Sequence, residues 1–196
     1  MLDNILTVSS YGICLFSLDI LKDFLIKEKV RSKRILKNFQ DNHNRYLNAL
    51  TEGVWTPFVL INSIKYVIKL GNYKESFGDE WEEKFVYHGF NIEVKDSLWI
   101  GSIGLFYDFD INKFLGNDDV SYQTLDGITL YSGFKYEVPT GKYLVSIKGY
   151  ARRKKLDYPN ANFGYLFTLD KVNDFEGFND PREDGKYNFN VANMHV

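Results

Sequence analysis

The chain has little of what marks several protein classes. Among its 196 residues there is one cysteine, Cys14, so an intrachain disulfide is excluded, and the sequence has no Cys/His cluster of the kind that holds a structural zinc. No apolar run approaches the ~20 residues that a membrane-spanning helix needs. The apolar stretch from Ile5 to Phe16 has no basic segment before it and is interrupted by Ser9 and Ser10, which argues against a secretory signal. We therefore expect a soluble protein of the reducing cytoplasm that does not bind membranes.

An excess of charge of one sign is also missing. The formal net charge is −2, so the chain lacks the basic excess of a protein that binds nucleic acid directly. The charges are nevertheless unevenly divided, because residues 1–78 carry 11 basic and 7 acidic side chains (+4), whereas residues 79–196 carry 13 basic and 19 acidic ones (−6). The acidic C-terminal part is suited to a basic protein partner.

What the chain does have is aromatic residues and a change of periodicity. Phe and Tyr number 16 and 14, which favours β structure. Apolar residues recur at helical spacing over about residues 18–52, with Ser17 as a candidate N-cap, and after Gly53 the period falls to two. Strands are expected at Phe58–Ile61, Ile64–Leu70, Lys84–Val94, Leu98–Phe109, Ile128–Val138, Lys142–Tyr150 and Phe163–Leu169, after a first strand at Leu6–Phe16.

These elements predict the α+β class: an antiparallel β-sandwich or curved sheet with an N-terminal helical embellishment. We expect a single domain over residues 1–196, with a β-rich core at about 54–170 and an ordered C-terminal coil at 171–196. Pro139-Thr140-Gly141 lies between two alternating segments and predicts a β-hairpin. Asn62-Ser63 is compatible either with a hairpin turn or with an irregularity in one long strand.

Residues for catalysis or metal binding are not gathered in any strong motif. A run from Asp108 through Asp110 and Asn112 to Asp119 resembles a calcium loop, but Lys113 replaces the glycine that such a loop needs at its sixth position. The histidines, His43, His88 and His195, lie far apart in the sequence, Cys14 lies in an apolar strand where burial would make its thiol inert, and Ser102 lacks the spacing of a nucleophile elbow. We expect no enzyme activity, no cofactor and no metal.

Two basic clusters are candidate contacts for a phosphate or an acidic partner, although a solvated surface explains them equally simply. The first cluster comprises Lys27, Lys29, Arg31, Lys33, Arg34 and Lys37. The second is Arg152-Arg153-Lys154-Lys155, just after a predicted strand.

Acidic and aromatic residues alternate near the C-terminus. They are Asp174, Glu176, Asp180, Glu183 and Asp184, together with Phe175 and Phe178. Carboxylates placed like phosphates and rings placed like bases can mimic a nucleic acid, so these residues are the predicted contacts for a basic partner. The competing interpretation is a loop whose rings pack on the sheet while its acids stay in water.

The segment LYSGFKYEVPTGKYLVSIKGYARR, residues 130–153, resembles small bacterial β-sandwich proteins of two kinds, toxin-immunity proteins and competence-protein-J type inhibitors of DNA-entry nucleases. The resemblance covers 24 residues, and it implies a sandwich fold and an inhibitory function without assigning inhibitory residues. Together with the acidic C-terminal half, it favours a cytoplasmic binding protein that neutralises an enzyme, such as a nuclease-like toxin. The alternative is a small-molecule or carbohydrate-binding module or an enzyme, with Trp55, Trp81 or Trp99 as stacking platforms in an aromatic-lined cleft.

Overall fold

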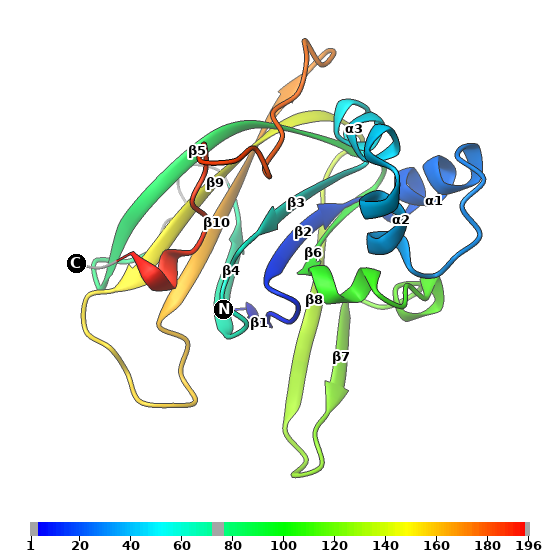
Figure 1. The fold of residues 1–196 in the computed structure, drawn as a ribbon. Helices are drawn as coiled ribbons and strands as arrows, with labels where there is room; N and C mark the ends of the chain where they lie inside the picture. Colours follow the sequence, from blue (N-terminus) through cyan, green and yellow to red (C-terminus); the bar gives the residue numbers. More distant parts are fainter. Residues whose placement is uncertain (1–3, 72–76, 195–196) are drawn as a thin grey trace.

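The computed structural model describes residues 4–71 and 77–194, and its body is one continuous, strongly curved β-sheet (Figure 1). Within these residues nine strands follow one another in the order β3-β2-β6-β8-β1-β4-β10-β9-β5, and β7 is added beside β8. The strands are β1 Asn4–Thr7, β2 Gly12–Phe16, β3 Trp55–Val59, β4 Lys65–Leu70, β5 Trp81–Val94, β6 Ser97–Ser102, β7 Asp119–Gln123, β8 Thr129–Glu137, β9 Gly141–Arg152 and β10 Phe163–Val172.

The sheet is curved because neighbouring strands bend at matching positions, and we call each such bend a corner. Val94 of β5 lies opposite Gly141 of β9, and Ser97 of β6 lies opposite Glu137 of β8, so the register of the two strand pairs continues across the bend between them. The two bends contact each other, because the Thr140 hydroxyl lies 3.2 Å from both the backbone nitrogen and a carboxylate oxygen of Asp96. The chain therefore turns a corner at Pro139-Thr140-Gly141 without reversing.

The β-hairpin predicted at Pro139-Thr140-Gly141 is consequently wrong. β8 pairs with β6, β1 and β7, whereas β9 pairs with β10 and β5. Proline and glycine provide a bend in either case, but whether the flanking strands pair with each other depends on which partners complete the core. The local sequence does not contain that information.

The second pair of corners lies at residues 8–11 and 60–64. β1 pairs antiparallel with β4, and β2 pairs antiparallel with β3. Ser10, Tyr11 and Leu60 adopt φ values of 60°, 58° and 61°, which are unusual for residues with a side chain and redirect both strands. The predicted strand Leu6–Phe16 is thus bent into two strands. Asn62-Ser63 belongs to an interruption between β3 and β4, which are not paired with each other.

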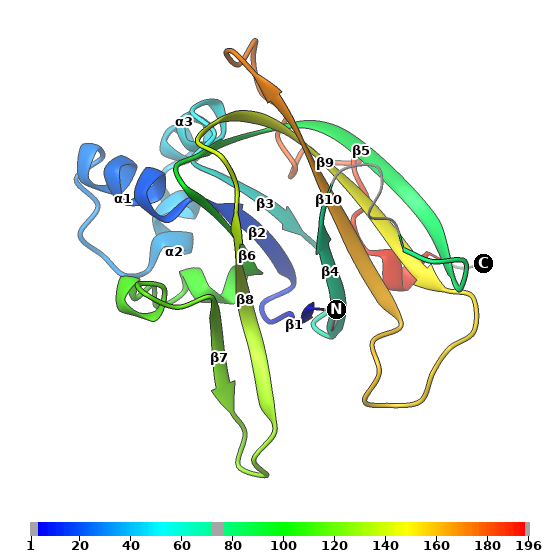
Figure 2. The same cartoon turned by 180° about the vertical axis from the view of Figure 1, so that it is seen from behind.

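The curved sheet is nearly closed, with a seam between its end strands β3 and β5 (Figures 1 and 2). Thr56 and Asn91 bridge the seam through a hydrogen bond from the Thr56 hydroxyl to the Asn91 carbonyl oxygen, 2.7 Å long. The α+β class and the curved sheet are confirmed, and the continuous sheet corresponds to the second of the two predicted architectures.

Aromatic side chains fill the interior of the sheet. The ring of Phe58 lies 5.3 Å from that of Phe90, 5.8 Å from that of Phe167 and 5.0 Å from that of Phe189, measured between centroids. Phe189 belongs to the C-terminal coil, so a segment outside the sheet contributes to the main core. The Tyr165 hydroxyl fixes this segment by donating to the Phe189 carbonyl oxygen at 2.8 Å.

Three helices cover the outer face of β2, β3 and β6: α1 Leu18–Lys27, α2 Ile35–Asp41 and α3 His43–Thr51 (Figure 2). Their bounds agree with the helical segment predicted at 18–52. Ile13 and Leu15 of β2 face the interior while Cys14 and Phe16 pack under the helices. Burial of both faces explains why β2 is apolar at every position and does not alternate.

We expect Phe189→Ala to lower the free energy of unfolding by about 3–5 kcal/mol, because Phe189 is only 2% exposed and its loss would leave a cavity between five aromatic rings. The matched control is Phe178→Ala, since Phe178 lies in the same coil but is 40% exposed. Chemical denaturation of the two variants would test this. Equal losses in both would mean that the C-terminal coil is not part of the core.

Candidate functional site

The C-terminal tail, residues 173–194, runs along the seam of the sheet (Figure 1). Asn179 donates to the Gly89 carbonyl of β5 at 2.9 Å, and Asn91 of β5 donates to the Gly177 carbonyl at 2.7 Å. Further along, Asn190 donates to the side chain of Asn62 at 2.9 Å, beyond the end of β3. The tail is therefore an ordered strap over the seam.

The five predicted contact acids of the tail fall into two groups. Asp174 forms an ion pair with Lys142 at 2.5 Å, Glu183 forms one with Lys186 at 2.9 Å, and Asp180 is hydrogen-bonded within the fold. Glu176 and Asp184 are exposed, and neither forms an ion pair with any residue that the structure describes. These two carboxylates are the ones that the fold leaves available to a partner.

The two predicted contact rings also differ. Phe175 packs on Gly53, where an added Cβ would lie 2.8 Å from the ring, and Lys142 lies 5.3 Å from its centroid. Gly53 has a φ of +67°, so glycine is required there for two reasons. Phe178 is more exposed. Some side chains of the tail therefore pack against the rest of the protein, whereas others lie in water.

A three-residue cluster anchors the middle of the tail to α3. The hydroxyl of Tyr46, a fully buried residue, donates to the Asp180 carboxylate at 2.5 Å. The same carboxylate oxygen accepts from the Arg182 backbone N–H at 2.8 Å, and the Arg182 guanidinium stacks on the Tyr46 ring at 3.5 Å. Two causes raise the pKa of Tyr46 well above its usual value: burial, which has the larger effect, and the hydrogen bond to Asp180.

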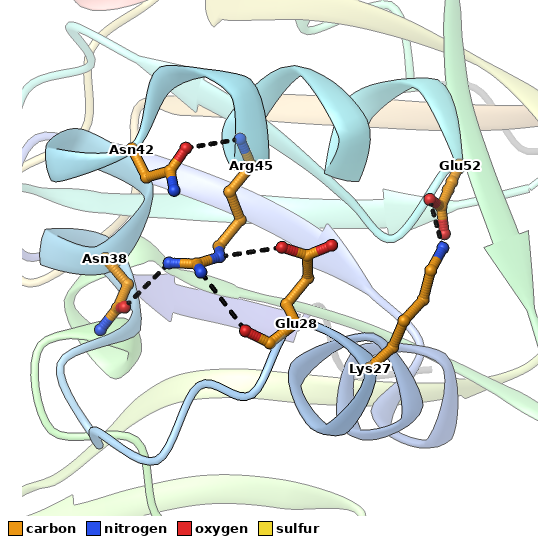
Figure 3. A network of polar contacts seen from close by, with 6 residues as sticks. All are labelled: Lys27, Glu28, Asn38, Asn42, Arg45 and Glu52. Carbon is orange, nitrogen blue, oxygen red and sulfur yellow. Dashed lines mark hydrogen bonds and ion pairs between the residues drawn. The ribbon is translucent and has the colours of Figure 1, made fainter.

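The first basic cluster is partly used inside the molecule, as Figure 3 shows. Lys27 pairs with Glu52 at 2.7 Å and Lys37 with Asp41 at 2.9 Å. Beside them, Arg45 of α3 donates to the Glu28 carboxylate, to the Glu28 carbonyl and to Asn38, which joins the three helices. The remaining cations of this cluster, Lys29, Arg31, Lys33 and Arg34, form no ion pair with the residues that the structure describes.

In the second basic cluster, the first two residues contact Trp81 at the start of β5 and the loop before it. The Arg152 guanidinium lies 4.3 Å from the Trp81 ring centroid, and Arg153 donates to the Asp79 carbonyl at 3.1 Å. Lys154 and Lys155 are exposed. The cluster is therefore partly a packing feature of the β9 end.

The candidates for chemistry are dispersed. Within residues 4–71 and 77–194, no three metal-binding side chains come together. Asp110 caps the short 3-10 helix η2, Ile111–Lys113, by accepting from the Asn112 N–H at 3.1 Å, which is a structural role. His43 lies on α3 and His88 on β5, while His195 lies outside the described residues.

Cys14 and Ser102 are likewise built into the fold. Burial raises the pKa of the Cys14 thiol, so it is not a reactive thiolate. The Ser102 hydroxyl donates to the Ser9 carbonyl oxygen and accepts from the Ser9 N–H, both at 2.8 Å, and so it secures the corner between β1 and β2. Neither residue is placed as a nucleophile.

The three tryptophans are not exposed stacking platforms. Trp55 and Trp99 are buried under the helices, where Trp55 stacks on Phe39 with 4.6 Å between centroids. Trp81 is buried in a small cluster on the outer face of β9 and β10. Trp55 nevertheless lines a surface pocket, which is described below.

The hairpin of β7 and β8 projects from the body (Figures 1 and 2), and of its two strands the sequence predicted only β8, as Ile128–Val138. β7 pairs only with β8, so its outer edge is unpaired within the described chain. Tyr122 lies opposite Leu130, and Ile128 precedes Leu130 by two residues, which places all three on one face. Leu125 at the tip is fully exposed, and Tyr122 and Ile128 are 52% and 44% exposed. The only sequence signal was Asp126-Gly127 between two short alternating segments.

Likeness to known proteins gives no guide to the site. No protein-family model matches the chain, and neither does any curated protein or solved structure. Among the residues that the structure describes, no helix is both long and apolar enough to span a bilayer. The functional interpretation therefore depends on three surface features: the hairpin, the tail and the pocket beside Trp55.

Removing the Asp180 carboxylate should loosen the tail. We expect Asp180→Ala to cost about 1–3 kcal/mol of unfolding free energy, because the buried Tyr46 hydroxyl loses its acceptor. Glu176→Ala is the control, since that carboxylate is exposed and makes no ion pair within the described chain, and it should change stability by less than about 0.5 kcal/mol. Urea unfolding would measure both. A neutral Asp180→Ala would show that the tail does not depend on this contact.

The protein should lose stability in alkali. The folded state raises the pKa of five tyrosines, Tyr46, Tyr66, Tyr136, Tyr150 and Tyr165, chiefly through burial. Their contribution is complete below the ordinary tyrosine pKa of about 10 and is lost as the pH rises above it, because only the unfolded chain then releases the protons. Tyr46→Phe should reduce the slope of unfolding free energy above pH 10 by about 1.4 kcal/mol per pH unit. An unchanged slope would contradict the assignment.

Proposed function

We propose that this chain is a binding protein that neutralises an enzyme, as an inhibitor or immunity protein against a nuclease-like toxin with a basic surface. The observation that carries the proposal is the projecting β7–β8 hairpin with its exposed apolar side chains. The partial resemblance of residues 130–153 to nuclease inhibitors and immunity proteins supports it, and so does the location of that segment, which begins in this hairpin.

The hairpin has the composition of a contact surface. Burying a leucine or isoleucine side chain contributes about 1.5–3 kcal/mol. Leu125 is fully exposed and Ile128 is partly exposed in the fold, so their burial against a partner would contribute free energy to binding. Exposed apolar groups gathered on one projecting element are typical of protein interaction sites, and tyrosines such as Tyr122 are enriched among the residues that dominate binding.

The charge of the hairpin indicates the kind of partner. Between Phe114 and Phe134 the chain carries Asp118, Asp119 and Asp126 and no lysine, arginine or histidine. An apolar ribbon with only negative charges around it suits a basic surface, because complementary potentials speed association and disfavour acidic partners. Glu176 and Asp184 of the tail form a second acidic surface, which we propose as an additional contact together with Phe178.

The test uses the product of the gene next to that of this chain, produced as a purified enzyme, with its nuclease activity as the readout. We expect stoichiometric inhibition, and we expect Leu125→Asp to weaken it at least tenfold without lowering the melting temperature, since Leu125 is fully exposed. Leu156→Asp is the matched control, because Leu156 is an exposed leucine of another loop, and its inhibition constant should stay within twofold.

The contribution of the tail is separable. Reversing Glu176 and Asp184 to lysine should slow association and flatten its dependence on salt while the melting temperature is kept, because these exposed charges contribute little to folding. Equal inhibition by Leu125→Asp and the unaltered chain would exclude the hairpin as the contact. If the neighbouring product is a metabolic enzyme that the chain leaves fully active, the inhibitor proposal itself fails.

A further inference from the structure

A pocket of about 240 Å³ lies on the outer side of β3, and its walls come from five separate parts of the chain. Trp55 comes from β3, Leu36 from α2, Tyr11 from the corner between β1 and β2, and Tyr107 from the end of the 3-10 helix η1, Ile103–Phe106. Arg182 of the tail completes the walls. The C-terminal tail thus contributes the positive charge of the pocket.

Two residues that line this pocket each carry a hydrogen-bond donor without a partner. The indole Nε1 of Trp55 and the guanidinium Nε of Arg182 are both buried, and neither meets an acceptor. Buried donors are paired in the great majority of cases, since leaving one unpaired costs free energy. Across the described residues these are the only two buried side-chain nitrogen or oxygen atoms without a partner, and both belong to residues that line one pocket.

The charge of Arg182 is also left unpaired. Its guanidinium stacks on the Tyr46 ring, and no carboxylate of the described chain lies within ion-pair distance of it. Asp180 is close in sequence, but its carboxylate accepts hydrogen bonds from the Tyr46 hydroxyl and the Arg182 backbone N–H. The arginine side chain is therefore held in place by its contacts with Tyr46, and its Nε is left without an acceptor.

The mouth of the pocket is apolar and strained. Tyr11, Leu60 and Tyr107 line it and are more than half exposed. Ser10, Tyr11 and Leu60 are three of the five non-glycine residues with positive φ in the described chain, and all three line the pocket. Residues held in such conformations concentrate at binding sites. The strained corners thus present exposed rings and a leucine around two unpaired donors.

We infer that this pocket binds a small carboxylate with an apolar or aromatic body. Both donors are closed off from water in the unliganded structure, so the two side chains must shift for the carboxylate to accept from Arg182 Nε and Trp55 Nε1. The body of the ligand would lie against Leu36 and the apolar mouth. A volume of about 240 Å³ suits a small aromatic acid. The inference is independent of the proposed protein partner, because it concerns a different surface and a different class of ligand.

The test is a titration of the full-length protein with phenylacetate, followed by NMR of the tryptophan indole N–H groups. We expect saturable binding that shifts the Trp55 resonance, with Trp81 and Trp99 as internal references because they do not line the pocket. The neutral analogue 2-phenylethanol should bind at least tenfold more weakly, because it cannot form the charge-assisted pair with Arg182. Inorganic phosphate should also bind more weakly, since it leaves the apolar walls uncovered.

Two variants locate the site. Arg182→Met keeps an apolar stem on Tyr46 but removes the donors, so phenylacetate should bind at least tenfold more weakly. Lys186→Met is the matched control, because Lys186 is a tail cation outside the pocket, and its affinity should stay within twofold. The inference is overturned if phenylacetate does not saturate, if either the neutral analogue or phosphate binds as tightly, or if both variants lose affinity equally. The comparison of ligands on the unaltered protein decides the matter even if Arg182→Met unfolds.

Discussion

The seam between β3 and β5 is the constraint on which the rest of the structure depends. A sheet that curves this far brings its end strands together, and here they meet through single contacts such as Thr56 to Asn91, without a ladder. The interior beneath the seam is filled by Phe58 and Phe90, which need cover from water. The tail provides it by inserting Phe189 and by satisfying backbone groups of β5 through Asn179.

The tail therefore has a role in folding that comes before any role in binding. Its sequence alternates acids and rings because some residues must reach the sheet and others must stay in water. Asp174 and Asp180 are committed to Lys142 and Tyr46, so they cannot be exchanged without a cost in stability. Glu176 and Asp184 are not committed in this way, which separates the contacts that hold the strap from those that a partner could use.

The C-terminal tail contributes to one of the two surfaces for which we propose functions, the pocket beside Trp55. The matching bends of neighbouring strands make the sheet a rigid support for the β7–β8 hairpin. The hairpin would therefore lose little conformational entropy on binding the proposed partner. Arg182 lines the pocket beside Trp55 because the tail that carries it crosses the seam next to β3. We propose the hairpin as an apolar, acidic surface for a protein partner and the pocket as a cationic, apolar site for a small acid.

The sequence by itself determined the local features. Apolar spacing located the helices at 18–52, alternation located β5, β8, β9 and β10 within a few residues, and the gathering of Gly, Asn and Asp after residue 172 indicated an ordered coil. Burial of Cys14 followed from the apolar run around it. Strand β7 was not predicted, because its alternation is short: only Val120 and Tyr122 are apolar among its five residues, and Tyr122 is exposed.

Only the tertiary structure decided which strands pair and which side chains meet. Pro139-Thr140-Gly141 bends the chain whether it forms a hairpin or a corner, and the outcome depends on β5 and β6, which lie 40 residues earlier and bend at the matching place. Arg182 and Trp55 are separated by 127 positions and carry no shared motif, so their common pocket could not be predicted. Local patterns set the conformation of a segment, but the choice of partner follows from burying all apolar faces at once, which is a property of the whole chain.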